Sequence, residues 1–262
     1  MSKQEQRELE LNRGIKTKEH SRIVGLFDID GTLTNGFAIF SFAEYLLSKN
    51  LFDAGSWELM QADFKKYQIS NKDHGDYERF AINLVIHYAR GLKGRSTIKI
   101  DTEAELFSEK VRKGEITDYV VLDFSPALVQ MINNIGETIA ISGSPYEVLL
   151  PIVRDLGFRE LRATKMKISE GRFTGEPEIN MALDTTKEQV VRESITGVDV
   201  SRSFAFGDSI HDLPILEAVE NRFVLGDNSS LQDFAIKNGW GVYKNGVGVN
   251  DVVASRIKKL FE

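Results

Sequence analysis

The sequence predicts an α/β fold in which a doubly wound parallel sheet of Rossmann-like type carries an inserted all-helical cap domain. Three patterns lead to this prediction. Residues 23–27 are apolar and have the pattern of a buried parallel strand, which ends in two carboxylates. From about residue 125 onward, short apolar strands alternate with helices. Between these parts, residues 53–113 repeat apolar positions at helical spacing without strand alternation.

The composition is that of an ordinary globular protein. Hydrophobic residues make up 42% and charged residues 27% of the 262 residues. The formal net charge of -6 argues against nucleic-acid binding, which favours a basic excess. Because the chain has no cysteine, a disulfide, a thiolate metal site and a cysteine nucleophile are excluded. The same observation predicts a cytoplasmic location.

The chain begins with a polar stretch over residues 1–21. It lacks the apolar segment of a secretory signal, so we expect a solvated, partly helical leader. The long uncharged run that includes residues 32–43 is shorter than the roughly 20 apolar residues that span a bilayer. No stable membrane insertion is therefore expected. The α/β core is predicted to comprise residues 22–36 and 124–262.

Residues 37–123 are predicted to form the helical cap. Residues 37–47 are apolar on nearly every side, and no basic residues flank them as an interfacial membrane helix would require. We therefore expect a helix buried within the cap, and a cap that contacts a lipid phosphate is a weaker alternative. The stretch Thr102–Glu105 has the pattern of a capping box, which predicts the start of another helix.

The second part of the core is expected to alternate between helices and strands. Ser125 and Pro126 have the pattern of a helix start, residues 138–141 that of a strand, and Gly157 ends the helix that follows. A β-hairpin is expected over residues 161–174. Further elements are expected as a helix from 185, strands at 203–206, 223–225 and 241–243, and a last helix from 252.

Acidic and polar side chains follow three of the predicted strands. Asp28 and Asp30 follow the first strand, Ser142 the second, and Asp208 and Asp212 the strand at 203–206. Because ligands bind beyond the carboxyl ends of the strands in such sheets, we expect these groups to converge. Carboxylates as close as Asp28 and Asp30 repel by roughly 4 kcal/mol near a protein surface. A set of oxygen ligands favours a hard cation, and the sequence predicts Mg²⁺.

Two features beside these acids indicate phosphate binding. The stretch Ser144–Glu147 has the pattern of a capping box with proline in the first turn, which would place the amides near Gly143 at a positive helix end. Lys187 lies in the first turn of its predicted helix, where the helix dipole favours acids. Each feature alone also fits a solvated loop, an ordinary cap or a surface lysine. Their joint order along the chain favours a functional site.

Four motifs together resemble those of the haloacid dehalogenase superfamily. They are DIDGT at residues 28–32, the serine at 142, the lysine at 187 and GDSIHDLP at 207–214. The likeness is strongest to the phosphoserine-phosphatase-like branch of subfamily IB type, whose helical C1 cap is inserted between the first two motifs. The stretch GRFTGE at 171–176 also resembles a hairpin of that branch.

This resemblance implies roles for the acids. Asp28 would attack the phosphorus to form an aspartyl-phosphate. Asp30 would act first as general acid toward the leaving alcohol and then as general base toward water. Mg²⁺ would be held by Asp28, Asp208 and the backbone carbonyl of Asp30.

The resemblance also implies how the phosphoryl group is bound. Ser142, Gly143 and Lys187 would contact its oxygens and stabilise the charge that develops on them. Asp212 and Ser209 would lie behind these residues and steady Lys187 or a metal-bound water.

One position departs from the resemblance. In phosphoserine phosphatases, a glutamate shortly after the first motif binds the amine of the substrate, and the corresponding residue here is Phe37. An aromatic ring forms no salt bridge with an ammonium group, so we expect a substrate other than phosphoserine. For Arg79, Arg90 and Arg95, a solvated helix face is favoured over a position that faces the site. For His211, a spacer role is favoured over contact with the site.

The sequence therefore predicts a Mg²⁺-dependent phosphomonoester phosphatase that acts on a small phosphorylated metabolite. Two alternatives use the same residues. A phosphotransferase or mutase would pass the phosphoryl group to another acceptor, and a catalytically silent regulatory protein would bind phosphate without turnover. The expected partner is a small-molecule phosphate ester, and no sequence pattern specifies an oligomeric state.

Overall fold

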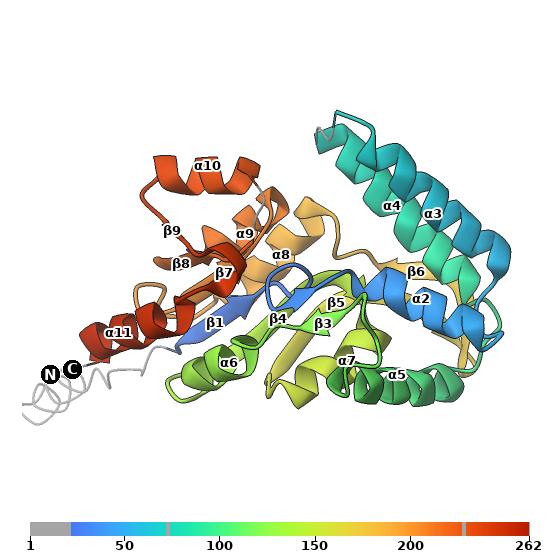
Figure 1. Ribbon diagram of the computed structural model, residues 1–262, viewed down its shortest axis with the longest axis horizontal. Helices are drawn as coiled ribbons and strands as arrows, with labels where there is room; N and C mark the ends of the chain where they lie inside the picture. The colour runs from blue at the N-terminus through green and yellow to red at the C-terminus, as the bar shows by residue number, and fades with distance from the viewer. Residues whose placement is uncertain (1–21, 72–73, 227–228, 262) are drawn as a thin grey trace, which may run out of the picture.

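The computed structural model describes residues 22–71, 74–226 and 229–261 (Figure 1). The leader predicted at residues 1–21 lies outside this range. Within the described residues, a seven-stranded sheet has the order β6-β5-β4-β1-β7-β8-β9, and all neighbours pair in parallel except β5 and β6. The predicted α/β class with a parallel sheet is confirmed. The strands are β1 (Val24–Phe27), β4 (Glu137–Pro145), β5 (Glu160–Ser169), β6 (Arg172–Ile179), β7 (Phe204–Gly207), β8 (Asn221–Val224) and β9 (Gly241–Val242).

The first strand lies at the centre of the sheet. Phe27 of β1 pairs with Ala140 of β4 on one side and with Phe206 of β7 on the other. All four residues of β1 are buried, as expected for a strand covered on both faces. This register brings the carboxyl ends of β1, β4 and β7 to the same edge of the sheet.

Helices cover both faces of the sheet because successive side chains of a strand point to opposite sides. Phe27 belongs to the hydrophobic cluster under α6 (Ser125–Asn133), α7 (Tyr146–Asp155) and α11 (Val249–Phe261). Its neighbour Leu26 belongs to the cluster under α8 (Asp184–Ser194), α9 (Leu213–Leu216) and α10 (Ser229–Lys237). Two short 3-10 turns, η1 (Ile210–Asp212) and η2 (Lys244–Gly246), complete the core. The chain therefore forms a three-layer sandwich.

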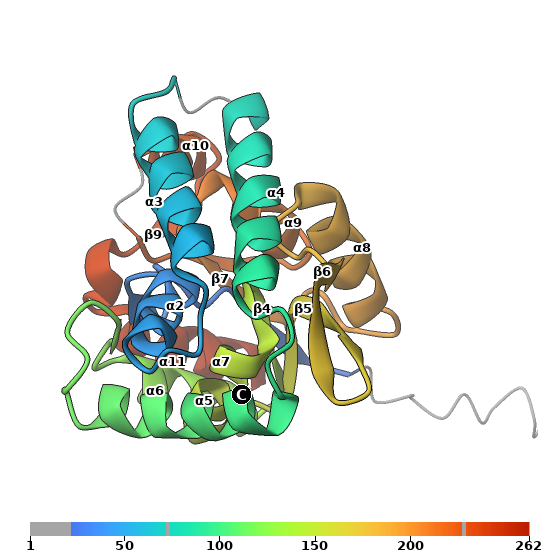
Figure 2. The ribbon, with the colours of Figure 1, turned by 90° about the vertical axis from the view of Figure 1, so that its right-hand side faces the viewer.

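Four helices follow β1 in the chain. They are α2 (Ala38–Ser48), α3 (Ala54–Gln68), α4 (His74–Gly91) and α5 (Thr97–Arg112). Helices α3 and α4 lie side by side and extend past the carboxyl edge of the sheet (Figures 1 and 2). The capping box predicted at Thr102–Glu105 is wrong, because α5 already runs from Thr97 and the Thr102 hydroxyl donates to the carbonyl of Ile98 at 2.8 Å. Helical patterns locate a helix better than they locate its first residue.

A short antiparallel ribbon connects the four helices to the sheet. It consists of β2 (Thr34–Asn35) and β3 (Val120–Val121), with Asn35 opposite Val120. The chain thus enters and leaves the helical segment at adjacent positions. Gly36 is required at this crossing, because its φ is 98° and a Cβ there would lie 2.0 Å from the Asp118 carbonyl oxygen. The cap boundaries at residues 37 and 123 stay predictions, and the stretch between them contains the strand β3 in addition to helices.

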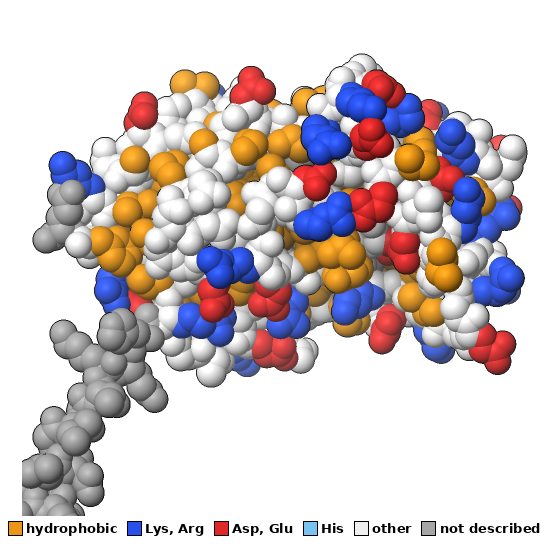
Figure 3. Space-filling view, turned by 90° about the horizontal axis from the view of Figure 1, so that it is seen from below, with side chains coloured by type: hydrophobic (Ala, Val, Ile, Leu, Met, Phe, Trp, Pro, Cys, Tyr) orange, Lys and Arg blue, Asp and Glu red, His pale blue; other side chains and the backbone are white. Residues whose placement is uncertain are grey.

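The described residues contain no helix that is long and apolar enough to cross a membrane. On the face of the molecule shown in Figure 3, acidic and basic side chains are interspersed and apolar side chains lie between them.

Candidate active site

The end of β1 positions Asp28 at the carboxyl edge of the sheet. Its backbone N–H donates to the carbonyl of Phe206 at 3.0 Å, which continues the pairing of β1 with β7. A tight turn follows, in which Leu33 and Thr34 donate to the carbonyl of Ile29 at 2.9 and 3.1 Å. Asp28 is 6% exposed.

Gly31 allows this turn to approach the loop after β7. Its φ is 89°, a conformation that favours glycine, and a Cβ there would lie 2.5 Å from Oδ2 of Asp208. The missing side chain therefore creates the space in which the Asp208 carboxylate lies beside the first acidic motif.

Thr32 connects the two acidic motifs. Its hydroxyl lies 2.8 Å from Oδ1 of Asp208, to which it donates, and 3.3 Å from Oδ2 of Asp28. Thr32 is fully buried. No role is expected for Thr32 from the sequence alone, although its place within the DIDGT motif is a signal for one.

Lys187 lies among the acids as a buried cation. Its Nζ is 2.8 Å from Oδ1 of Asp212 and 3.7 Å from Oδ1 of Asp28. Burial lowers the pKa of Lys187, but the carboxylates of Asp212 and Asp28 have the larger combined effect. They hold the pKa of Lys187 above its ordinary value. The helix start at Asp184 places Lys187 in the first turn of α8, as predicted.

Asp212 holds the loop after β7 in shape. Its Oδ2 accepts hydrogen bonds from the N–H of Asp208 at 3.1 Å and from the N–H and hydroxyl of Ser209 at 2.9 and 3.0 Å. Although burial opposes ionisation, Lys187 and these donors together keep the pKa of Asp212 below its ordinary value. Asp212 is therefore the ionised partner of Lys187.

Asp30 has a different environment from Asp28. Its Oδ2 accepts hydrogen bonds from the Ser144 hydroxyl and from the backbone N–H of Ala38, the latter at 3.3 Å. Burial raises the pKa of Asp30 to about 6, and the hydrogen bond from Ser144 opposes this rise. The carboxyl therefore exchanges a proton near neutral pH.

The capping box predicted at Ser144–Glu147 is wrong. Helix α7 begins at Tyr146 with Pro145 as its N-cap, and no side chain caps it. Ser144 instead donates to Asp30, and Glu147 is buried near Tyr88 of α4. Ser144 thus bonds a residue of another segment and Glu147 is buried, so the local cap that the pattern predicted does not form.

Ser142 and Gly143 end the straight part of β4. The Ser142 hydroxyl accepts a hydrogen bond from the N–H of Ser144 at 3.2 Å, and Ser142 is 1% exposed. The carbonyl of Gly143 accepts from the Thr164 hydroxyl at 2.6 Å. A Cβ at Gly143 would lie 3.1 Å from the Cβ of Ala182, so a larger residue would crowd the neighbouring loop.

Three carboxylates form a cluster that fits a divalent cation. Asp28, Asp208 and Asp212 each offer an oxygen within 4.8 Å of those of the other two. Burial, followed by repulsion from Asp212, raises the pKa of Asp28 and that of Asp208, the latter to about 7. A bound cation would relieve this repulsion, and oxygen donors suit Mg²⁺. The carboxylate of Asp30 is not in this cluster, and only its backbone carbonyl was expected to contribute.

All the residues predicted for the site border one cavity of about 350 Å³. They are Asp28, Asp30, Ser142, Gly143, Lys187, Asp208, Ser209 and Asp212. His211 borders the same cavity, and its ring stacks on Tyr77 of α4 with centroids 3.3 Å apart. This contact between the core and the helical segment was not predicted. Arg79, Arg90 and Arg95 do not line the cavity, in agreement with the expected solvated faces.

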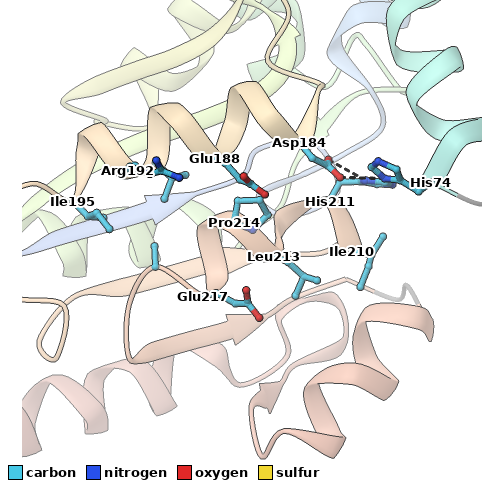
Figure 4. Close-up of a pocket in the computed structure, with 12 residues that line it drawn as sticks. His74, Asp184, Glu188, Arg192, Ile195, Ile210, His211, Leu213, Pro214 and Glu217 are labelled. Atoms are coloured by element: carbon cyan, nitrogen blue, oxygen red, sulfur yellow. Dashed lines mark hydrogen bonds and ion pairs between the residues drawn. The ribbon is translucent and has the colours of Figure 1, made fainter.

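A larger pocket of about 670 Å³ lies beside the active-site cavity and contains none of the acids predicted for the site (Figure 4). His74 of α4 and His211 both approach Asp184, at 3.5 and 3.3 Å. Figure 4 shows these three side chains meeting at one end of the pocket. Asp184 therefore links the tip of α4 to the core.

Comparison with known proteins identifies the family. The sequence profile of the haloacid dehalogenase-like hydrolases matches residues 26–217. The chain belongs to this family. The matched range begins in β1 and ends just past α9, so it includes both acidic motifs and Lys187 of this haloacid dehalogenase-like hydrolase.

Relatives of this hydrolase are named as phosphatases. A probable phosphatase of Mycobacterium tuberculosis is 25% identical over 231 residues, which cover 86% of this chain and 76% of that protein. A histidinol-phosphatase of Neisseria meningitidis is 25% identical over 230 residues, which cover 84% of this chain and 97% of that protein. A substrate-bound phosphoserine phosphatase shares the fold with a TM-score of 0.59 and 16% identity, covering 89% of this chain and 98% of that one. The protein is a haloacid dehalogenase-like phosphatase.

Proposed function

We propose that this phosphatase hydrolyses a small phosphomonoester through a phosphorylated Asp28, with Mg²⁺ as cofactor. The observation that carries the proposal is the position of Asp28, which lies at a central strand end between a buried lysine and the Asp208 carboxylate. Lys187 balances the charge of Asp28 without shielding it from the cavity.

Asp28 and Asp30 take different parts in this proposal. An oxygen of Asp28 forms a bond to phosphorus while the bond to the leaving oxygen breaks, and Asp30 donates its proton to that oxygen. Water then attacks the phosphorus, Asp30 takes up the proton of the water, and Asp28 is released. A pKa of about 6 suits Asp30 to both proton transfers near neutral pH.

The remaining residues bind and orient the phosphoryl group. Lys187 and the Ser142 hydroxyl would contact its oxygens, and the backbone of Gly143 would lie beside them. Asp212 holds Lys187 in place through the 2.8 Å ion pair. Asp28, Asp208 and the carbonyl of Asp30 would hold Mg²⁺, which supplies positive charge beside the phosphate.

The lining of the cavity argues against two amine-bearing substrates, phosphoserine and histidinol phosphate. The named activities of the relatives suggest both compounds. Phe37, where phosphoserine phosphatases are expected to carry a glutamate, borders the cavity with 53% of its side chain exposed. Among the described residues that line the cavity, the carboxylates are Asp28, Asp30, Asp208 and Asp212, all at the reaction centre. The described lining therefore offers no further carboxylate to bind a substrate amine.

The proposal is tested with p-nitrophenyl phosphate as substrate. We expect Mg²⁺-dependent hydrolysis that EDTA abolishes, and Asp28→Asn should reduce kcat by roughly a thousandfold or more. The exposed Asp251→Asn is the matched control and should retain full activity. Full activity of Asp28→Asn would overturn the proposal.

A second experiment detects the intermediate. Asp30→Asn lacks the base for the second step, whereas p-nitrophenolate leaves without an acid, so the phosphorylated enzyme should accumulate. Mass spectrometry after an acid quench should find one phosphoryl group on the peptide that contains Asp28.

Phosphorus NMR with added alcohols identifies a phosphotransferase if a new ester forms, and tight phosphate binding without turnover identifies a regulatory protein.

A further inference from the structure

One part of the lining of the active-site cavity is aromatic. It consists of Phe37 before α2, Phe64 and Tyr67 of α3, and Tyr77 and Phe80 of α4, which we name the aromatic wall. Tyr67 and Phe80 stack with centroids 4.8 Å apart and an interplanar angle of 6°. Phe64 lies 5.9 Å from Phe80 and 6.3 Å from Phe37. The five side chains form a connected array over the reaction centre.

These rings are only partly covered by the protein itself. Phe37 is 53% exposed, and the other four members of the aromatic wall are partly buried. Rings that serve only to pack the cap would be covered more completely, as Tyr88 and Phe42 are. Because apolar surface gains free energy when it leaves water, the wall favours an apolar partner in the cavity.

Among the described residues of the helical segment, no charged side chain lines the active-site cavity. Arg79 of α4 pairs with Asp76 and does not line the cavity, while His87 lies 3.2 Å from Asp63. Among the described residues that line the cavity, the fixed charges belong to the reaction centre. The part of a substrate that lies beyond its phosphate would therefore meet rings and aliphatic side chains, without an ion partner.

A second pocket shares two members of the aromatic wall. Its volume is about 370 Å³, and Phe37 and Phe64 border both pockets. On its far side lie Phe40 and Trp57, whose ring centroids are 6.3 Å apart. Phe37 and Phe64 thus form the partition between the cavity that holds the acids and a second pocket, whose lining combines aromatic rings with the polar residues Ser41, Gln61, Lys65, Gln68 and Asp118.

We propose that the substrate is the phosphate monoester of an uncharged, apolar alcohol, and that Phe37 and Phe64 determine this specificity. The inference rests on the proposed phosphatase function. The phosphate lies on the acids and Lys187, and the apolar group lies against the aromatic wall. A short aromatic group fits the first cavity, whereas a longer aliphatic chain would pass the partition and reach Trp57.

The test compares kcat/KM of the Mg²⁺-loaded full chain for hexyl phosphate, naphthyl phosphate, phosphoserine and histidinol phosphate. We expect at least one of the two apolar esters to exceed both amine-bearing esters by about tenfold or more, mainly through a lower KM. A preference for naphthyl phosphate identifies an aromatic substrate, and one for hexyl phosphate an aliphatic substrate. Equal or better turnover of either amine-bearing ester overturns the inference and leaves the phosphatase function standing.

A charge placed in the wall provides the matched variant. Phe37→Glu should lower kcat/KM for the preferred apolar ester by about tenfold and raise it for phosphoserine. The control Ile69→Glu adds the same charge at a residue that follows α3, is 88% exposed and does not line the cavity, so it should change neither value. Unchanged selectivity in Phe37→Glu contradicts the role of Phe37.

A binding measurement separates this inference from the proposed reaction. Calorimetry with hexylphosphonate, naphthylphosphonate and 2-aminoethylphosphonate requires no turnover. We expect at least one apolar phosphonate to bind about tenfold more tightly than the amine, and Phe64→Ser to remove the difference. Equal affinities overturn the inference. If no ester is hydrolysed but this preference is found, the proposed reaction fails and the binding specificity stands.

Discussion

Replacement of Glu147 by glutamine should stabilise the protein at alkaline pH. Glu147 is in the first turn of α7, 8% exposed, and the Tyr88 hydroxyl of α4 lies near it. Burial raises the pKa of this carboxyl from 4.5 to about 7, although its own backbone N–H and Tyr88 lower it in part. Glu147→Gln keeps the size of the side chain and removes its charge.

The magnitude follows from the linkage of proton binding to folding. A carboxyl whose pKa is higher in the folded state binds more protons there, so its contribution to stability falls as the pH rises. The loss in the free energy of unfolding that Glu147 causes is absent well below pH 4.5, grows between pH 4.5 and about 7, and is constant above that. With about 1.4 kcal/mol for each pH unit, it amounts to about 1 kcal/mol at pH 5 and about 3 kcal/mol at pH 8.

Urea unfolding of wild type and Glu147→Gln at pH 5 and pH 8 measures this difference. The free energy of unfolding of the variant, relative to wild type, should rise by about 2 kcal/mol between the two pH values. Any constant cost of burying the amide cancels in this comparison. The exposed Glu58→Gln on α3 serves as the control and should show no such change. A relative stability of Glu147→Gln that is equal at both pH values would refute the reasoning.

Three further predictions concern the active site. Lys187→Met leaves Asp212 and the nearby carboxylates without their buried counter-charge, and should lower the free energy of unfolding by about 3 to 5 kcal/mol in urea titrations; a loss below about 1 kcal/mol would contradict the ion pair. Gly31→Ala should reduce kcat/KM by roughly tenfold or more, because its Cβ meets Asp208. Gly94→Ala is the control and should retain activity. Gly94 also has a positive φ, 75°, but a Cβ there would meet no atom within 4 Å, so this variant measures the backbone strain alone. Addition of Mg²⁺ at a hundredfold excess over its Kd should stabilise the fold by about 2.7 kcal/mol in calorimetry, and an unchanged Tm would argue against the metal site.

Much of the fold and of the site could be predicted from the sequence because the relevant rules are local. The apolar run before Asp28 identifies the central strand, and the helix that starts at Asp184 puts Lys187 in its first turn. Parallel strands bring their carboxyl ends to one edge, which is why acids far apart in the chain, such as Asp28 and Asp208, meet. These conclusions needed only periodicity, helix start signals and one topological rule.

Other features required the contacts between elements. The side chains of Ser144 and Glu147 have the spacing of a capping box, yet Ser144 donates to Asp30 and Glu147 is buried near Tyr88 of α4, so neither side chain caps α7. The role of Thr32 also depends on the register of β1 against β7, which brings the loop after β7 within hydrogen-bond distance.

The sequence by itself determined the α/β class and the acids and lysine that line one cavity, because each depends on a pattern within one segment. Only the tertiary structure decided what lies above those acids. Helical periodicity shows that Phe64 and Phe80 share faces with other apolar residues, but not whether those faces meet the core or a cavity. These rings and Phe37 stay partly exposed in the cavity that holds the acids, and this depends on how α3 packs against α4 and α2.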